Sequence, residues 1–510
     1  MRRLLHRLLG RTAIILAAVV LQIVLVLSLF LGLSNYFGVF QIVMYVIGAI
    51  VTVNLINRDS NPDTKIPWLV VVLLLPVFGT VLYLMFSRNR TSIRETRRQE
   101  RVRQRCRDVL REEERRHKDT AALAKEYRGQ SSYLNHTGMS YLYGNTDTEY
   151  YPDGESFFEA LLEALRSAEH FIFMEYFIVE AGYMWDRVHE VLRDRAAAGV
   201  EIHFMYDDFG CSGVAPRRFA QTLRDEGIHV VCFHRFTPLV SAVHNNRDHR
   251  KITVVDGRVG FCGGINIGDN YINRTHPFGH WKDSAVRLTG DGVTNLSLMF
   301  LELYCMEGRL EFDFGKYLSP RRPGNTFEGL VQPFCDGPCP FNTDAVAENA
   351  YLNLINQAQS YIYITTPYLI IDFPLRNALE SAAKRGVDVR IVTPHIPDKK
   401  MVFYVTRGGY SSLIRAGVRI FEYTPGFIHA KNVLCDGVVG VVGSINFDYR
   451  SLIHHYECGV WMYRTRALEQ LRTDFDGLWE CCEEQTEESA RQSMPRRVLC
   501  RLMALFTPLL

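Results

Sequence analysis

The chain has 510 residues, of which 47% are hydrophobic and 22% charged, and its 58 Lys and Arg nearly cancel its 56 Asp and Glu. These values exclude a disordered or fibrous protein, and the length provides enough material for two ordinary domains. The 12 cysteines lack the paired C-x2-C spacing of a zinc site, so we expect free thiols in a reducing compartment.

The beginning of the chain has the composition of a membrane segment. Residues 13–33 form a nearly unbroken apolar run, long enough at roughly 1.5 Å per residue to cross the hydrocarbon. The run is longer than the core of a typical signal peptide, and no small-residue cleavage pattern follows it. Two further runs, 39–56 and 66–86, predict a hairpin across the turn at 57–65. We therefore expect residues 1–87 to be a membrane anchor with two or three transmembrane helices.

A basic segment follows the anchor. Residues 88–118 carry 13 Lys or Arg against six Asp or Glu, and the N-terminus is basic as well. Because positive flanks favour the cytoplasmic side, we expect the part of the chain after the anchor to face the cytoplasm. Residues 88–132 are predicted to form a basic linker helix, which is either a solvated spacer or a segment attracted to anionic lipid headgroups.

From residue 133 onward the pattern is that of an α/β protein. Short β-rich runs at 171–179 and 201–206 alternate with helical stretches at 155–167 and 184–198. Such alternation predicts sheets covered by helices.

The α/β pattern occurs twice. Three segments of the first copy, which begin at Ala168, Gly199 and Gly227, have similar segments 190, 187 and 190 residues later. A nearly constant shift of this size indicates an internal duplication into domain-sized halves. We place the halves at 133–325 and 326–485, followed by a basic amphipathic tail at 486–510. The tail is predicted to be an interfacial helix or a helix docked on the protein. Residues 236–243, just ahead of the first motif described below, are interpreted as an acyl-chain entry or as ordinary core.

Each half carries the same polar string, H-x-K-x4-D-x6-G-(G/S)-x-N, and the two strings are 180 residues apart. A His and a Lys two positions apart on a strand share one face. The Asp-Gly pair then ends the strand in a hairpin turn, and the returning strand ends in small residues that let a backbone approach a ligand. The members are His249, Lys251, Asp256 and Asn266 in the first half, and His429, Lys431, Asp436, Ser444 and Asn446 in the second.

These residue types suit a phosphate. Lysine supplies charge, asparagine supplies N–H donors, and histidine can attack phosphorus or transfer a proton. A lone histidine on a strand is more often structural, but two complete strings at one fixed offset do not arise by chance. Asp256 and Asp436 are counted with the candidate catalytic residues as members of the motif, and their predicted role is to tether the loop.

The duplicated strings resemble the paired HKD motifs of the phospholipase D superfamily, and residues 66–83 resemble the N-terminal membrane hairpin of bacterial cardiolipin synthases. The resemblance implies two similar α/β/α half-domains related by a pseudo-twofold axis. It also implies transfer of a phosphatidyl group from one phosphatidylglycerol to another, which gives cardiolipin and glycerol through a covalent phosphohistidine. No metal or other cofactor is implied. The alternatives are a hydrolytic phospholipase D or another phosphatidyltransferase, while two complete motifs disfavour an inactive scaffold.

The resemblance also implies roles for individual residues. His249 is the predicted nucleophile and His429 the general acid, an assignment that the similarity of the halves makes reversible. Carboxylates after each motif, Asp283 and Glu457, are predicted to orient the histidines. The phosphoryl oxygens are expected to be held by Lys251, Lys431, Asn266, Asn446 and Ser444.

Two positions depart from the family pattern: Ala285, where a histidine is frequent, and His455, where many relatives carry asparagine. These departures put detailed copying of acceptor-site contacts in doubt. The implied partners are phospholipids rather than nucleic acid, and the implied location is a bacterial cell membrane, which the chain crosses several times. The sequence predicts no oligomeric state.

Overall fold

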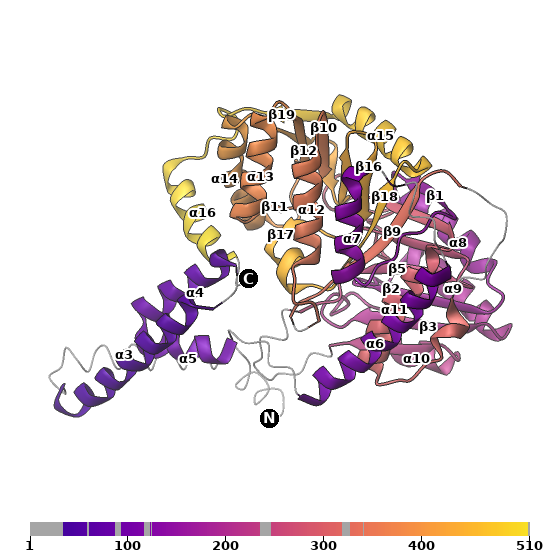
Figure 1. Cartoon of the computed structure of the whole chain (residues 1–510), viewed down its shortest axis with the longest axis horizontal. Coiled ribbons are helices and arrows are strands. Elements are labelled where there is room, and N and C mark those ends of the chain that lie inside the picture. Colours follow the sequence, from indigo (N-terminus) through magenta and orange to yellow (C-terminus); the bar gives the residue numbers. More distant parts are fainter. Residues whose placement is uncertain are drawn as a thin grey trace. The chain divides into compact units, whose positions relative to one another are not determined.

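The computed structural model describes residues 34–58, 61–86, 93–116, 123, 125–234, 246–318, 327–339 and 341–507 (Figure 1). The first apolar run, 13–33, and the suggested acyl-chain entry, 236–243, lie outside the described residues. The chain divides into two compact units. The smaller contains the helices before residue 93, and the larger contains residues 93–235 and 247–500.

The described residues of the smaller unit before residue 93 form α3 (Ser34–Ile56), α4 (Pro62–Leu74) and α5 (Pro76–Phe86). Val51, Leu55, Val72 and Tyr83 form its small core. The run 66–86, which the sequence predicts as one helix, is broken at Leu75, where φ is −128° and ψ is 71°. In the sequence Leu75 is followed by a proline, and the helical region is disfavoured for a residue in that position, although Ile66 stays helical before Pro67 within α4.

The break limits how far this run can reach. Helices of 13 and 11 residues are about 20 Å and 17 Å long, against roughly 30 Å for the hydrocarbon of a bilayer. Across the part of the chain that the structure describes, no helix combines the length and the apolar character needed to span a membrane. The expected spans are therefore not seen among these helices.

The first sheet of the larger unit has seven strands in the order β1-β8-β6-β5-β2-β3-β4. Strands β2, β3 and β4 run parallel to one another, and the strands from β5 to β1 pair antiparallel. The strands are β1 (Thr146–Tyr151), β2 (Phe171–Tyr176), β3 (Glu201–Asp207), β4 (His229–Phe233), β5 (Lys251–Val255), β6 (Val259–Gly263) and β8 (Ala285–Gly290).

The second sheet repeats this order and adds one strand. Its order is β9-β18-β16-β15-β10-β12-β13-β19, so each of its first seven strands has a counterpart in the first sheet. The strands are β9 (Leu330–Asp336), β10 (Tyr361–Thr365), β12 (Asp388–Pro394), β13 (Arg419–Tyr423), β15 (Asn432–Cys435), β16 (Val439–Gly443), β18 (Glu457–Tyr463) and β19 (Cys482–Gln485). The similar segments found in the sequence begin at or just before the counterpart pairs β2/β10, β3/β12 and β4/β13.

Two short strand pairs form separate two-stranded sheets. One joins β11 (Leu369–Ile370) to β17 (Phe447–Asp448) within the second half. The other joins β7 (His280–Lys282) of the first half to β14 (Gly426–Ile428) of the second. The second pair links the halves next to one of the two motifs.

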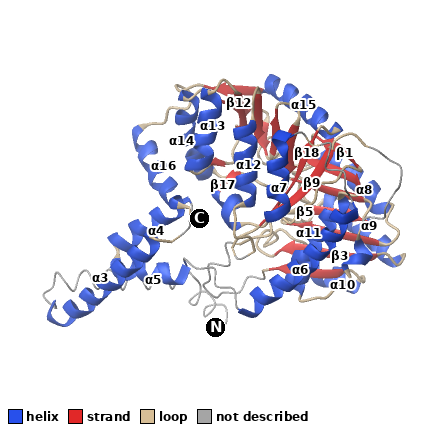
Figure 2. Cartoon of the chain, viewed as in Figure 1, coloured by secondary structure: helices blue, strands red, loops and turns tan. Residues whose placement is uncertain are grey.

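Helices cover the sheets (Figure 2). They are α6 (Ile93–Arg116), α7 (Arg128–Thr137), α8 (Gly154–Arg166), α9 (Tyr183–Ala197), α10 (Phe219–Asp225), α11 (Val293–Gly308), α12 (Val346–Gln357), α13 (Phe373–Lys384), α14 (Lys400–Arg415) and α15 (Arg466–Leu478). A mostly exposed helix, α16 (Met494–Phe506), follows, and its Arg496 lies over the ring of Tyr404 in α14. Short turns of helix occur at Lys125–Tyr127, Phe314–Tyr317, Arg450–His454 and Trp479–Cys481. The mixed α/β class predicted from the sequence is confirmed.

Alternation along the strands separates three hydrophobic layers. On β2, Phe171 and Phe173 join a central core shared by both sheets, whereas Ile172 and Met174 join the core beneath α8 and α9. Successive side chains point to opposite faces of a strand, so one strand serves two layers. The central layer contains the almost wholly buried α11 together with α15, and the second sheet packs on its other face against α12 and α13.

The basic helix α6 packs against the rest of the larger unit. Val102 and Cys106 are buried in the central core, and Arg103 forms an ion pair with the buried Glu302 of α11 at 3.0 Å. The opposite face of α6 is exposed. A purely solvated spacer would bury neither Val102 nor Cys106. The interpretation of residues 88–118 as such a spacer is therefore too simple.

Candidate active site

The two motif histidines lie just before their strands rather than on them. Strand β5 begins at Lys251, and the backbone N–H of His249 donates to the carbonyl of Tyr456 at 2.9 Å. Similarly, His429 lies between β14 and β15 and donates to the carbonyl of Lys282 at 2.6 Å. The sequence placed both on the motif strand. Both histidines lie outside the strand because their backbone N–H groups donate to carbonyls of the opposite half.

The histidine side chains are held across the halves as well. Nδ1 of His249 lies 2.9 Å from Oε1 of Glu457, and Nδ1 of His429 lies 2.6 Å from Oδ2 of Asp283. All four side chains are buried. The predicted orienting carboxylates are thus next to the histidines, each belonging to the half that does not contain its partner. A proton on Nδ1 leaves Nε2 of each ring as the atom that can attack phosphorus or carry a second proton.

The first pair is kept neutral by its surroundings. Burial lowers the pKa of His249 well below its ordinary value, and the charge of Lys251 adds to the effect. Burial raises the pKa of Glu457 well above its ordinary value, although Lys251 opposes the rise. His249 is therefore a neutral imidazole, with a proton on only one ring nitrogen, at neutral pH.

The second pair differs in the state of its carboxylate. Burial pushes the pKa of Asp283 upward, but His429 and Lys431 outweigh it and bring the pKa below its ordinary value. Burial lowers the pKa of His429 to about 4, with Lys431 contributing and Asp283 opposing. An ionised Asp283 is thus available to stabilise a proton on His429 when a negative charge arrives beside it.

The motif lysines face the same site. Each donates a hydrogen bond to the carbonyl of its own motif histidine, at 2.5 Å from Nζ of Lys251 and by a similar contact from Lys431. Burial lowers the pKa of Lys251 to about 8 and that of Lys431 to about 7, and each lysine contributes to the electrostatics of the opposite histidine. The two motifs therefore form one site with a concentration of positive charge.

The remaining candidate phosphate ligands are engaged within the protein to different degrees. Oδ1 of Asn266 accepts from the Ile178 N–H at 3.0 Å, and its Nδ2 donates to Tyr271 at 2.8 Å. Oδ1 of Asn446, by contrast, is buried without a hydrogen-bond partner among the described residues. Ser444 donates to Oε2 of Glu457 and accepts from the Cys458 N–H. The hydroxyl of Ser444 therefore holds the carboxylate beside His249.

The motif aspartates tie down the turn before a neighbouring strand. The carboxylate of Asp256 accepts from the backbone N–H groups of Glu169, His170 and Phe171, each at 2.8 Å. Asp436 makes the same three contacts, with residues 359–361. Neither aspartate contacts a motif histidine, which agrees with the predicted tether.

Replacing Asp256 by alanine is expected to lower the free energy of unfolding by about 3 kcal/mol, because three part-buried backbone donors lose their acceptor. Asp436→Ala should have a smaller effect, because two of its three contacts are exposed. Denaturant unfolding of each purified variant measures the loss. Turnover per folded molecule should stay near that of the parent, and a fall of about a hundredfold with unchanged stability would contradict the structural role.

The small residues after each motif make room for the neighbouring strand. A Cβ on Gly263 would lie 2.5 Å from the carbonyl of Ser284, and one on Gly264 would lie 2.2 Å from Oδ1 of Asp283. The sequence interpretation assigned this space to a ligand. The close neighbour is instead protein, including the carboxylate that holds His429.

Sequence reasoning missed an ion pair beneath the first motif. Arg250 points away from the site and is completely buried, where it bonds Glu175 of β2 with Nε at 2.9 Å and contacts Asp248 at 3.4 Å. Fully buried arginines are rare unless paired, so no local pattern indicated this one. The pair anchors the segment that carries His249.

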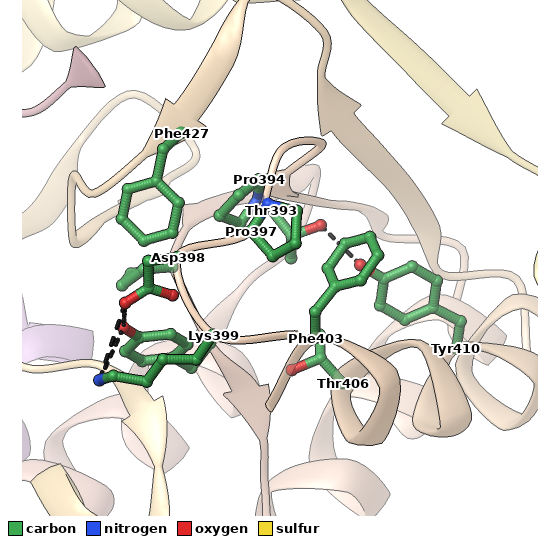
Figure 3. A pocket seen from close by; sticks show the side chains of 11 residues that line it. Thr393, Pro394, Pro397, Asp398, Lys399, Phe403, Thr406, Tyr410 and Phe427 are labelled. Carbon is green, nitrogen blue, oxygen red and sulfur yellow. Dashed lines mark hydrogen bonds and ion pairs between the residues drawn. The ribbon is translucent and has the colours of Figure 1, made fainter. Parts of the chain in front are cut away.

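Aromatic rings surround both histidines. Phe177 lies 5.1 Å from His249, and Trp281 and Tyr271 lie 5.3 Å and 5.7 Å from His429, measured between ring centroids. Phe427 packs on Trp281 and is also one of the residues that line a small pocket (Figure 3). Polar groups of that pocket bond one another, since Tyr368 donates to Asp398 at 2.5 Å. It contains none of the candidate site residues.

Comparisons with known proteins show the family of the chain. Residues 351–479 match the family model described as cardiolipin synthase, PLD-like domain, and residues 43–88 match the phospholipase D-nuclease N-terminal model. A cardiolipin synthase of Geobacillus sp. (strain WCH70) is 33% identical over 89% of this chain and 90% of its own length. The chain belongs to the cardiolipin synthase family of the phospholipase D superfamily. Membership makes it a phosphatidyltransferase with phospholipid substrates.

Two further matches accompany this one. An uncharacterized protein of Streptococcus mutans serotype c is 40% identical over 82% of the chain and 91% of its own length. The crystal structure of phosphatidylserine synthase from Haemophilus influenzae Rd KW20 matches with a TM-score of 0.59 at 13% identity, covering 76% of this chain and all of that one. The structural match shows that the two-sheet architecture is the phospholipase-D-like fold.

Proposed function

We propose that the enzyme transfers the phosphatidyl group of one phosphatidylglycerol to a second phosphatidylglycerol, through a phosphohistidine on His249. The observation that carries the proposal is the crossed pairing of two buried histidines with two carboxylates around one site that also holds two lysines. Such a site offers one nucleophile, one proton carrier and fixed positive charge, and all three are needed to displace an alcohol from a phosphodiester.

In the first step Nε2 of His249 attacks phosphorus, and the bond from phosphorus to the glycerol oxygen breaks. His429 gives its Nε2 proton to the departing oxygen, so glycerol leaves neutral. In the second step His429 removes the proton from a headgroup hydroxyl of the second lipid. That oxygen attacks phosphorus, the P–N bond breaks, and His249 is regenerated. Two phosphatidylglycerols thus become one cardiolipin and one glycerol.

The carboxylates support this division of labour between the histidines. Asp283, whose pKa is lowered, is the better partner for a protonated imidazole, and it binds His429. Glu457, whose pKa is raised, leaves His249 neutral with a free lone pair. Lys251, Lys431, Asn446 and the second N–H of Asn266 hold the phosphoryl oxygens, and Ser444 positions Glu457.

We also propose that the smaller unit anchors the enzyme to the bacterial cell membrane, with the catalytic part on the cytoplasmic side. On α3 the side chains of Ile42, Val46, Ile50 and Val53 are between 54% and 65% exposed. A contiguous apolar surface of this kind is costly in water and suits lipid. The predicted boundaries at 87, 132, 325 and 485 remain our proposal for the anchor, linker helix, two halves and tail, with a pseudo-twofold axis relating the halves.

A lipid incubation tests the proposed function. The full chain in detergent micelles that contain phosphatidylglycerol alone should release cardiolipin and glycerol in equal amounts. Phosphatidic acid as the main product would mean that water is the acceptor and would replace transfer by hydrolysis. Varying the surface concentration of phosphatidylglycerol in the micelle sharpens the result, because transfer needs two lipids and hydrolysis only one.

The pH profile should reflect the lysines. Since burial brings the pKa of Lys431 to about 7 and that of Lys251 to about 8, their positive charge is present below these values and is lost above them. We expect kcat/KM for the donor lipid to fall as the pH rises through this range, by about tenfold per unit once one charge is lost. Lys431→Arg, which stays protonated, should be slower but should flatten the fall. A parent profile that is flat from neutral to alkaline pH would contradict this assignment.

A further inference from the structure

A third histidine lies in the site beside the proposed nucleophile. His455 is 9% exposed, and its Nδ1 lies 3.6 Å from Oε1 of Glu457, the oxygen that His249 also contacts. The rings of His249 and His455 are 5.4 Å apart between centroids. One potential ligand atom from each of the three residues falls within 4.8 Å of the other two.

The polar atoms of His455 are otherwise unused. Neither Nδ1 nor Nε2 has a hydrogen-bond partner among the described residues, although the side chain is almost completely buried. Leaving a buried polar group unpaired is unfavourable, so a ligand that satisfies these nitrogens gains binding energy. Glu457 begins β18, and the backbone of Tyr456 pairs with the segment that carries His249. The three side chains are therefore held by connected backbone.

We propose that His249, His455 and Glu457 form a binding site for a borderline divalent transition-metal ion such as Zn²⁺, which acts as an inhibitor. Two imidazoles and one carboxylate are a donor set that Zn²⁺ accepts, with a fourth position left open. Mg²⁺ and Ca²⁺ prefer oxygen ligands and do not fit this set. Lys251 and Arg450 oppose a cation here, so the affinity is lower than that of a structural zinc site.

Inhibition is expected because the bound ion changes which ring nitrogen of His249 carries the proton. Coordination through Nδ1 of His249, the atom beside Glu457, moves the proton of that nitrogen to Nε2, and the carboxyl of Glu457 releases its proton to solvent as it becomes a ligand. The lone pair that would attack phosphorus is then used for an N–H bond, and the hydrogen bond to Glu457 is replaced by a bond to the ion. Binding itself is independent of the proposed function, whereas the inhibition rests on His249 being the nucleophile.

Binding is tested on the full chain in detergent without lipid, by calorimetric titration with Zn²⁺ and by the visible absorption of Co²⁺. We expect one ion per chain in a Cys339→Ser background, which removes the one fully exposed thiol, and a Co²⁺ spectrum without a thiolate band. His455→Asn should weaken binding at least about tenfold, by the loss of one of three ligands. His454→Asn, the matched change at the adjacent histidine, should leave it unchanged.

Equal Zn²⁺ binding by the parent and by His455→Asn, or no binding by the parent, would overturn the site. Thermal unfolding of each variant shows that it is folded, and Glu457→Gln provides a second loss of a ligand should His455→Asn fail to fold. Inhibition is then measured as turnover with and without Zn²⁺ for each variant against itself, with recovery on adding a chelator. Zn²⁺ that binds without slowing the parent would overturn the inhibitory role alone, and loss of product in every metal-free sample would instead count against the proposed function.

Discussion

Replacing His249 by alanine is expected to lower cardiolipin formation by about 10⁴-fold or more, since no other group can take its place on phosphorus. His429→Ala should lower it by a similar factor, because the glycerol oxygen would have to leave without a proton. Both rings are more than nine-tenths buried in the site, and each is replaced by a smaller side chain. The purified variants should therefore fold, which circular dichroism and thermal unfolding can check.

A donor lipid with an activated leaving group separates the two roles. A phosphatidyl ester of nitrophenol needs no protonation on departure, so His429→Ala should still release one nitrophenol per chain in a burst. His249→Ala should release none. The opposite result would exchange the two histidines, and a burst from both variants would exclude a phosphohistidine on either ring.

The chain contains a matched control for these variants. Nε2 of His189 in α9 lies 2.6 Å from Oε2 of Glu226, which is also an imidazole–carboxylate pair, but this pair is partly exposed and contains no residue of either motif. His189→Ala removes an imidazole from a carboxylate without touching the proposed chemistry. Its turnover should stay within about twofold of the parent, as for a surface substitution.

Much of the fold and of the candidate site could be predicted because it depends on local sequence patterns. Short β-rich runs predicted β2 and β3, and the observed ends of these strands, at 176 and 207, lie within three positions of the predicted ends at 179 and 206. The constant offset of 180 residues predicted two equivalent motifs. The break at Leu75 agrees with the rule for a residue before proline, but Ile66 does not follow that rule, so the rule alone does not predict the break.

The rest depends on contacts between distant parts of the chain. Asp283 and Glu457 were recognisable as carboxylates that follow a motif, but which histidine each one holds is decided by how the halves pack. The burial of Arg250 with Glu175 and the unpaired nitrogens of His455 have the same origin. A polar residue in a sequence does not reveal whether its partner lies 2 or 200 positions away.

Asp283→Asn is expected to slow turnover by about 10²–10⁴-fold, because the amide can neither hold the tautomer of His429 nor stabilise its protonated form. The isosteric change keeps the buried volume, so the loss should appear in kcat with little change in stability. Glu457→Gln should have a similar effect through His249. With the nitrophenol ester, Asp283→Asn should regain the burst, whereas Glu457→Gln should not.

The decisive measurement is the coupling between these residues across the halves. If Asp283 acts only through His429, then Asp283→Asn should cost nothing further in a His429→Ala background, although the two are 146 positions apart. In a His249→Ala background, assayed for the residual slow reaction, the same change should keep its own effect. Asp283→Asn could instead cost nothing further in the His249→Ala background and keep its effect in the His429→Ala background. That result would pair each carboxylate with the histidine of its own half and would contradict the crossed geometry from which the proposed roles are argued. Additivity in both backgrounds would mean that Asp283 acts on the substrate directly.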